Sequence, residues 1–411
     1  MLAPALLLDL TRLVSRLGQG RQTGVDRVET AYLDHFLTLS TPVFGLVRSK
    51  LGFLLLDQRG MAAFQRQVAQ AAPLPSADLL SRLSRFREPL LAQAETAVRA
   101  LANTRCRPRH LPQMLRQNLP SGFAYFNTGH ANLAANTLAA IKAGGAAQRL
   151  VLVHDTIPLD HPAFTRPDTV TGFDQKIAAT AAHADCVIHT AHSTRSLTEL
   201  HFARHGRTPP GIVAPLGITT VKPNDAPPRP HPYFVTLGTI EPRKNHAFLL
   251  DLWQEMHRTL AAPDIPHLLI LGRRGWSNQT LFDRLDTLPF RNQTVFELPN
   301  LLDDAVANLL LHARALLFPS HVEGFGLPPI EAASLGTAVI VPPLPIYHET
   351  LGNYPVYASI VDSYSWMETI SRLTGDKNKN GQRGQMQKNA SKTAVKIPQW
   401  DAHFKIVLNF V

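Results

Sequence analysis

Short apolar segments alternate with helix-like segments throughout the second half of the chain, and this alternation restricts the fold more than any other feature. Each segment that we interpret as a strand is apolar along its whole length, as expected for a strand covered on both faces. Strands that alternate with helices in this way form a parallel sheet between two helical layers. The predicted strands are Tyr233–Gly238, His267–Gly272, Val295–Leu298, Ala315–Phe318 and Ala338–Val341, and the predicted helices are Asn245–Leu260, Asp303–Arg314 and Pro329–Leu335.

The first half of the chain follows a similar but less regular pattern. Its candidate strands are Ala5–Leu10, Val43–Val47, Leu150–His154 and Cys186–His189, and a Leu-, Ala- and Arg-rich helical stretch covers about residues 60–118. We therefore predict an α/β fold class in which two Rossmann-like, doubly wound domains face a central cleft.

A proline-rich segment separates the two halves. Val221–Pro232 contains five prolines in twelve residues, which excludes a helix or a central strand. The predicted organisation is an acceptor-binding domain over residues 1–222, a linker over 223–232, a donor-binding domain over 233–375 and a basic tail over 376–411. Within this tail, residues 398–411 are a candidate docking segment.

Composition narrows the class of protein. The 411 residues suit two domains, and 45% apolar with 18% charged residues is typical of a globular protein. The apolar start Met1–Leu10 lacks a basic region before it, so we interpret it as a buried strand and not as a signal peptide. Cys106 and Cys186 provide neither a disulfide framework nor a metal-ligand pair. The expected location is the cytoplasm.

The net charge of +10 is unevenly distributed. Residues 81–120 contain eight arginines, and their only acidic residues are Glu88 and Glu95. No zinc-finger or RNA-binding signature accompanies them, so nucleic acid ranks behind an anionic membrane or an acidic small ligand. The Arg-rich stretch 82–116 has two interpretations: a peripheral contact with the inner face of an anionic membrane, or a solvated helical face.

The segment Glu323–Glu331, EGFGLPPIE, is the strongest candidate site. It follows a predicted strand and opens a helix, and the free N–H groups of a helix start bind anions. We expect Glu331 in the first helical turn, where it could accept hydrogen bonds from a ribose, and Glu323 could reach sugar hydroxyls. A lone pair of glutamates, however, would more often be solvated surface groups. The residues between them that we assign to the site are Gly324, Phe325, Gly326 and Leu327.

The segment Gly238–Asn245, GTIEPRKN, is the second candidate. It follows another predicted strand of the same domain, and Gly238 and Thr239 stand at the turn. Arg243 and Lys244 could neutralise a departing diphosphate. A solvated basic pair is the alternative interpretation.

Two weaker candidates lie in the first half. Gly24 belongs to the glycine-containing stretch Gly20–Arg27, which could contact a diphosphate through backbone N–H groups or could be only a turn. His154 ends a predicted strand and could hydrogen-bond a substrate hydroxyl, or could be a satisfied, half-buried histidine.

The sequence offers no recognisable metal site. His201 and His205 are spaced four apart, but no HExxH pattern and no cysteine pair accompany them, and the chain has no Asp-x-Asp pattern. We therefore expect neither a metal nor a cofactor, so that Arg243, Lys244 and helix dipoles would carry the charge of any departing diphosphate.

The second half of the chain resembles glycosyltransferase family 4, a group of retaining enzymes with the GT-B fold. The resemblance rests on Tyr233–His246, Leu268–Trp276 and Leu317–Ile340, in which Glu323 and Glu331 match the family's E-x7-E pattern. Weaker matches lie at GVDRVE from Gly24, at HDTIP from His154 and at Pro215–Ile218. One departure is Thr239, which stands where many relatives have arginine.

The resemblance implies residue roles and a reaction. Glu331 would bind the donor ribose, Glu323 the transferred sugar, Arg243 and Lys244 the diphosphate, and His154 the donor sugar or the reaction centre. Gly24 would lie in a phosphate loop. The implied enzyme moves a hexosyl group of mannose or glucose type, with retention, from a GDP- or UDP-sugar to a glycan or lipid-linked acceptor in cell-surface polysaccharide synthesis.

Two other functions remain open at this point. Another GT-B enzyme, such as a phosphorylase or a sugar-nucleotide epimerase, would need different site residues. A non-catalytic relative that binds a nucleotide sugar would keep the binding residues and lack turnover.

Overall fold

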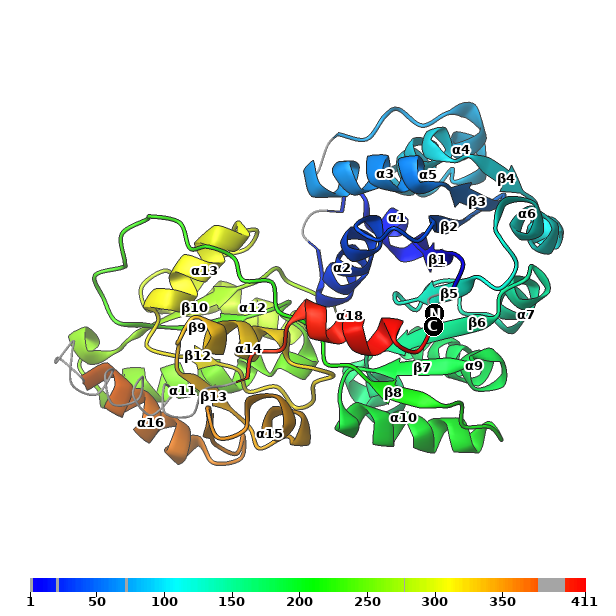
Figure 1. Ribbon diagram of the computed structural model, residues 1–411. Helices are drawn as coiled ribbons and strands as arrows, with labels where there is room; N and C mark the ends of the chain where they lie inside the picture. The colour runs from blue at the N-terminus through cyan, green and yellow to red at the C-terminus, as the bar shows by residue number, and fades with distance from the viewer. Residues whose placement is uncertain (1–2, 20–21, 71–72, 277, 376–395) are drawn as a thin grey trace. The chain divides into compact units, whose positions relative to one another are not determined.

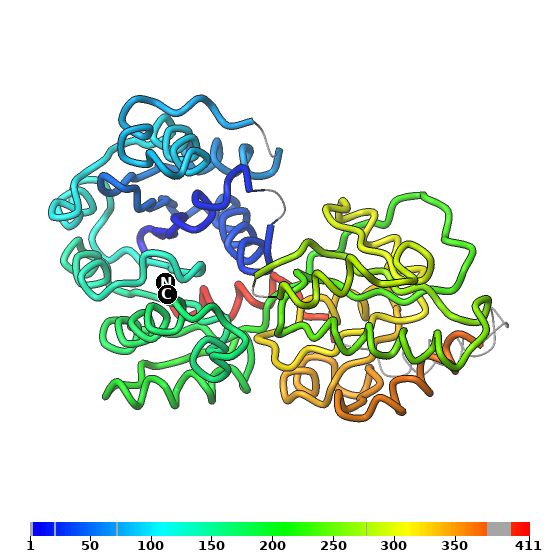
Figure 2. Tube along the Cα trace, turned by 180° about the vertical axis from the view of Figure 1, so that it is seen from behind, coloured from blue at the N-terminus to red at the C-terminus, as the bar shows by residue number. Residues whose placement is uncertain are grey.

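The computed structural model describes residues 3–19, 22–70, 73–276, 278–375 and 396–411. These residues form two compact units (Figures 1 and 2). Unit 1 contains residues 1–156, 171–216 and 400–411, and unit 2 contains residues 157–170 and 217–399. The domain boundaries expected from the sequence stay a prediction. They differ from these units because residues 157–170 group with unit 2, and the end of the chain groups with unit 1.

The sheet of unit 1 has the strand order β4-β3-β2-β1-β5-β6-β7-β8. The buried strand β1 pairs in parallel with both β2 and β5, so the start of the chain occupies the middle of the sheet. The strands are β1 (Leu6–Asp9), β2 (Val43–Ser49), β3 (Gly52–Leu56), β4 (Thr104–Cys106), β5 (Ala124–Asn127), β6 (Gln148–Val153), β7 (Cys186–His189) and β8 (Gly211–Val213).

Four strands of this sheet were not predicted from the sequence: β3, β4, β5 and β8. The pairs β2–β3 and β3–β4 are antiparallel, so one edge of the sheet departs from the doubly wound pattern. The predicted helical stretch over residues 60–118 is wrong as one continuous element, because β4 interrupts it. Short edge strands such as β4 carry too few residues to show a period of two.

Helices cover the sheet of unit 1 on both faces and complete its core (Figure 1). The α-helices are α1 (Thr11–Arg16), α2 (Gly24–Leu37), α3 (Gln58–Gln70), α4 (Leu79–Ser84), α5 (Pro89–Leu101), α6 (Leu111–Asn118), α7 (Ala135–Ala143), α9 (Pro167–His183), α10 (His192–Arg204) and α18 (Trp400–Leu408), and a 3-10 turn η1 covers Pro108–His110.

The last helix, α18, packs into unit 1 and is drawn in red in Figure 2. His403 is buried. Its Nδ1 donates to the Ala214 carbonyl oxygen at 3.0 Å, so its Nε2 accepts from the Tyr32 hydroxyl at 2.8 Å. The Phe404 ring stacks on the His35 ring at a centroid distance of 3.8 Å. These contacts tie the end of the chain to helix α2.

The sheet of unit 2 is parallel throughout and has the order β11-β10-β9-β12-β13-β14. This confirms the parallel sheet expected from the continuous apolar strands. The strands are β9 (Tyr233–Leu237), β10 (His267–Leu271), β11 (Val295–Glu297), β12 (Leu316–Leu317), β13 (Val339–Val341) and β14 (Val356–Tyr357).

An apolar core lies between the sheet of unit 2 and its helices, with Trp253 and Trp366 fully buried in it. Residues 157–170 join this unit through stacking of Phe164 on His321 at a centroid distance of 4.7 Å. The helices are α8 (Ile157–Asp160), α11 (His246–Thr259), α12 (Gln279–Thr287), α13 (Asp303–His312), α14 (Leu327–Ser334), α15 (Pro345–Leu351) and α16 (Ser363–Gly375), with 3-10 turns η2 (Pro162–Phe164), η3 (Pro242–Lys244) and η4 (Ala262–Asp264).

Candidate functional site

Two loops of unit 2 meet at the carboxyl ends of neighbouring strands. One loop follows β9 and contains η3, and the other follows β12 and leads into α14. The backbone N–H of His321 in the second loop donates to the Arg243 carbonyl oxygen in the first at 2.9 Å. The Arg243 guanidinium in turn donates to the Val322 carbonyl oxygen at 3.1 Å. The structure thus brings together two sequence motifs that are about 80 residues apart.

Glu323 accepts from both predicted cations through the same carboxylate oxygen. Its Oε1 lies 2.6 Å from the Lys244 ammonium and 2.7 Å from the Arg243 guanidinium. Arg243 also contacts Glu241 at 2.8 Å, and the Trp276 indole donates to Glu241 at 3.3 Å. All three central side chains are largely buried, so the interactions between their charges are only weakly screened by water.

This ion cluster shifts the ionisation of its members. Burial alone would raise the pKa of the Glu323 carboxyl, but the charges of Arg243 and Lys244 outweigh burial and lower this pKa to about 2. Burial lowers the pKa of Lys244, and the neighbouring Glu323 opposes this shift. Glu323 is therefore an anion over the whole physiological pH range. With Glu241 included, two carboxylates balance two cations.

Two glycines shape the loops around this cluster. Gly238 follows β9 with φ +139°, and a β-carbon on it would lie 3.4 Å from the Lys244 side chain. Gly326 precedes α14 with φ +78°, and a β-carbon on it would come within 2.8 Å of the Tyr347 ring. Both backbone conformations favour glycine, because a β-carbon is strained there. The predicted site residue Thr239 lies beside Gly238 and is half-buried.

Helix α14 begins at Leu327 with Gly326 as its N-cap, and Pro328 occupies the second helical position. The prolines at the helix start and Gly336 just beyond its end, with φ +73°, confirm the predicted helix signals. The predicted place of Glu331 in the first turn is wrong: the helix starts two residues earlier than expected, so Glu331 lies in the second turn. Its stabilisation by the helix dipole is correspondingly smaller.

Three further residues of unit 2 surround the cluster and were not predicted. Burial and the charge of Glu323 raise the pKa of Tyr347. His246, next to Lys244, is fully buried, and burial followed by the Lys244 charge lowers its pKa to about 3, so it adds no charge. Phe318 lies 4.2 Å below the Lys244 ammonium in a cation–π contact. Each of these side chains lies close to Lys244 or Glu323. Their effect on the cluster comes from burial, which the sequence does not show.

His154 lies in unit 1, directly after β6, and is buried. Its Nε2 is 2.6 Å from the Thr128 carbonyl oxygen and donates to it, so this nitrogen serves the structure. Burial lowers the pKa of His154 to about 4, and the ring is neutral at physiological pH. Of the two interpretations from the sequence, the structure favours a satisfied histidine, with Nδ1 as the nitrogen left for a ligand.

Gly24 is the first residue of helix α2, so it does not stand inside a loop as expected, and Gly20 lies outside the described residues. The Thr23 and Asp26 side chains form a capping box at this helix start. Arg12 contacts Asp26 at 3.0 Å. This network is partly buried, with Asp26 at its buried centre, and it orients the start of α2.

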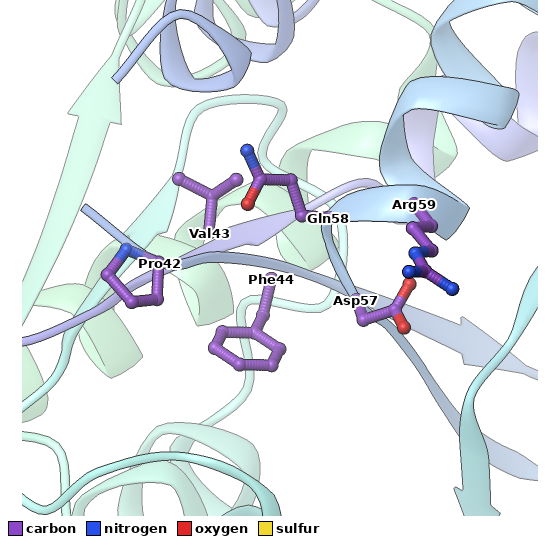
Figure 3. A pocket seen from close by; sticks show the side chains of 6 residues that line it. All are labelled: Pro42, Val43, Phe44, Asp57, Gln58 and Arg59. Carbon is purple, nitrogen blue, oxygen red and sulfur yellow. The ribbon is translucent and has the colours of Figure 1, made fainter. Parts of the chain in front are cut away.

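A pocket of about 320 Å³ lies elsewhere in unit 1 (Figure 3). It is lined by residues at the amino end of β2 and the start of α3, opposite to the carboxyl ends where ligands of such sheets bind. The lining residues are Pro42, Val43, Phe44, Asp57, Gln58 and Arg59. We assign it no part in the candidate site.

Metal sites and membrane-spanning helices would point to other classes of protein. Within them, no group of three or more His, Cys, Asp or Glu side chains is arranged to hold a metal ion. None of the helices in the described part of the chain has the length and hydropathy needed to cross a membrane.

Comparison with known proteins gives a family match in the second half of the chain. Residues 219–393 match the family described as glycosyl transferases group 1. The serotype-specific mannosyltransferase WbdA of Escherichia coli is 32% identical over 237 residues, which cover 53% of this chain and 29% of WbdA. The O-antigen chain mannosyltransferase RfbU of Salmonella typhimurium is 31% identical over 144 residues, covering 34% of this chain and 38% of RfbU. The chain thus spans less than two fifths of these relatives.

The solved structures establish the fold. Anabaena Alr3699/HepE in complex with UDP-glucose superposes with a TM-score of 0.64 at 13% identity and covers 99% of both chains. The two α/β units are therefore those of a GT-B fold, which confirms the predicted fold class.

Proposed function

Because residues 219–393 belong to the glycosyl transferases group 1 family, we propose that this chain is a retaining hexosyltransferase that uses a nucleotide-diphosphate sugar. The observation that carries the proposal is the ion cluster of Arg243, Lys244 and Glu323 at the carboxyl ends of β9 and β12. A nucleotide-sugar site needs fixed cations for the diphosphate beside an acceptor group for the sugar hydroxyls, and the cluster supplies both.

Lys244 and Arg243 would hold the diphosphate and stabilise it as it leaves. In the reaction, the bond between the anomeric carbon and the phosphate oxygen breaks, and a bond to the acceptor hydroxyl oxygen forms on the same face. The acceptor proton passes to the departing diphosphate. This front-face route needs no enzyme nucleophile, and no metal is expected because the two cations carry the leaving-group charge.

Glu323 would accept hydrogen bonds from hydroxyls of the transferred sugar, since its carboxylate stays ionised at physiological pH. Glu331 would bind the ribose. The backbone N–H groups at the start of α14, at Gly326 and Leu327, would face the phosphates, helped by Gly324 and Phe325. Gly238 and Thr239 would line the diphosphate site. For His154 and Gly24, the family resemblance suggests contacts with the donor sugar and with the phosphates, respectively.

The relatives support a narrower proposal about the substrates. Two curated relatives are mannosyltransferases, and one of them acts on the O-antigen chain, so we propose mannose as the transferred sugar and a glycan or lipid-linked glycan of the cell surface as the acceptor. GDP-mannose is then the first donor to test. The UDP-glucose bound to the structural neighbour makes UDP-sugars the second.

Thermal-shift measurements with GDP-mannose, UDP-glucose and ADP-glucose test the donor site. We expect one of them to stabilise the wild type and to lose this effect in Glu331→Ala. The matched control is Glu368→Ala, an exposed glutamate on α16 that should keep the full shift. If no nucleotide sugar shifts the wild type, the donor-site proposal is wrong. Binding of a donor without nucleotide release on any acceptor extract would instead support a non-catalytic relative.

A further inference from the structure

An apolar surface stands out on unit 1, around the junction of helices α4 and α5. Five of its side chains lie within twelve residues of each other and are 47% to 82% exposed. Elsewhere in the described part of the chain, the exposed large apolar residues are scattered over distant segments. The members of this α4–α5 apolar surface are Leu79, Leu80, Leu83, Phe86 and Leu90.

Polar contacts on its inner side hold the segment in place. Asp78 caps α4 by accepting from the Ser81 N–H at 2.7 Å, and it also pairs with Arg99. Ser81 is fully buried, and Arg85 contacts the buried Glu95 at 2.8 Å. Helix α4 therefore turns polar groups inward and leucines outward, the reverse of a surface helix that packs on a core. The apolar side chains are presented to solvent by a fixed scaffold.

The charges on this surface are positive. Glu88 pairs with Arg85, and Asp78 pairs with Arg99, so the acidic groups of the segment are neutralised. Arg82 and Arg87 are exposed among the apolar side chains, and no ion pair involving either is found in the described residues. Figure 1 shows α4 and α5 together at the β3–β4 side of the sheet of unit 1.

We propose that the α4–α5 apolar surface docks unit 1 on an anionic phospholipid bilayer. Leucine and phenylalanine side chains would enter the acyl boundary, and the two unpaired arginines would lie at the headgroup level. A second copy of the chain fits less well, because a symmetric contact would bring the unpaired arginines of both copies together. The proposal extends the proposed function without depending on it: an enzyme held in this way would reach an acceptor carried by a lipid.

Vesicle flotation without any sugar donor tests the surface. Wild-type protein should float with phosphatidylglycerol-containing vesicles and remain behind with pure phosphatidylcholine. The double variant Leu83→Glu/Phe86→Glu should lose at least about tenfold in partitioning. Arg82→Gln and Arg87→Gln should each lose about fivefold. The matched control Leu302→Glu/Val361→Glu changes two exposed apolar residues of unit 2 and should bind like the wild type.

The exposure of Leu83 and Phe86 means that their substitution should leave folding intact, which circular dichroism and thermal unfolding would check. Transfer to a water-soluble acceptor should also be unchanged in the double variant. The proposal is overturned if wild-type protein does not float with anionic vesicles. It is also overturned if Leu83→Glu/Phe86→Glu binds these vesicles as well as the control Leu302→Glu/Val361→Glu does. It is also overturned if the wild type is a dimer that Leu83→Glu/Phe86→Glu dissociates. A lack of transfer activity with intact vesicle binding would contradict only the proposed function.

Discussion

Replacing Glu323 by glutamine tests whether the ion cluster has the electrostatic character that the structure indicates. The substitution keeps the size of the side chain but leaves two largely buried cations without their shared anion. In the folded protein the pKa of Glu323 is about 2, compared with its ordinary 4.5, so its ionised form gains about 3 kcal/mol from its surroundings. Removing one partner of a buried ion pair costs a similar amount.

We therefore expect Glu323→Gln to lose about 3 kcal/mol of unfolding free energy at neutral pH, a drop of about 6–12 °C in Tm for a unit of this size. Because the folded pKa is depressed, this stabilisation is present above pH 4.5 and is lost as the pH falls toward 2. The gap between wild type and variant should thus narrow as the pH is lowered below about 4.5.

The same variant separates binding from transfer. With Glu323 neutralised, the two cations should attract a diphosphate more strongly, so UDP or GDP should raise the Tm of the variant more than that of the wild type, while hexosyl transfer is lost. Thermal unfolding with and without nucleotide, and a nucleotide-release assay, measure these effects. Equal stability at neutral pH together with equal nucleotide shifts in both proteins would refute the electrostatic reasoning. Glu368→Gln, on the exposed face of α16, is the matched control.

Three further predictions concern the folding of the two units. Gly326→Ala should destabilise by about 1–3 kcal/mol in thermal unfolding, since φ is +78° and the Tyr347 ring blocks the β-carbon; Gly172→Ala, in the open interior of α9, should be neutral or stabilising. Phe404→Ala in α18 should lose about 3–5 kcal/mol, whereas Ile406→Ala on the same helix, 40% exposed, should change little; equal losses would contradict the docking of α18. Burial lowers the pKa of His403 to about 4, so its contribution to stability is present above pH 6.5 and is lost as the pH falls toward 4; denaturant titrations over this window should show a shallower loss in His403→Gln.

The donor half of the fold could be read from the sequence because its strands are covered on both faces. Continuous apolar segments between helices leave no arrangement except a parallel sheet, and all five strands predicted in that half are present. In the first half, β4 escaped prediction because a three-residue antiparallel edge strand shows no clear periodicity, and β3, β5 and β8 were missed as well. The start of α14 was predicted two residues late, since prolines mark the first turn of a helix without fixing its first residue.

The candidate site, too, was only partly predictable from the sequence. The residue types and their order along the chain, with Arg243 and Lys244 in one motif and Glu323 in another, were visible in the sequence. Their ionisation was not, because it depends on burial and on distances between side chains about 80 residues apart.

The sequence by itself determined the fold class, the strand-to-loop positions of both motifs and the family of the second half, because local patterns and spacing carry that information. Only the tertiary structure decided that one oxygen of Glu323 contacts two cations and that Nε2 of His154 donates to the Thr128 carbonyl oxygen. It also decided that the leucines of α4 face solvent. Those facts depend on contacts between segments that are distant in the sequence and on which side chains stay exposed. A local sequence pattern determines neither the contacts nor the exposure.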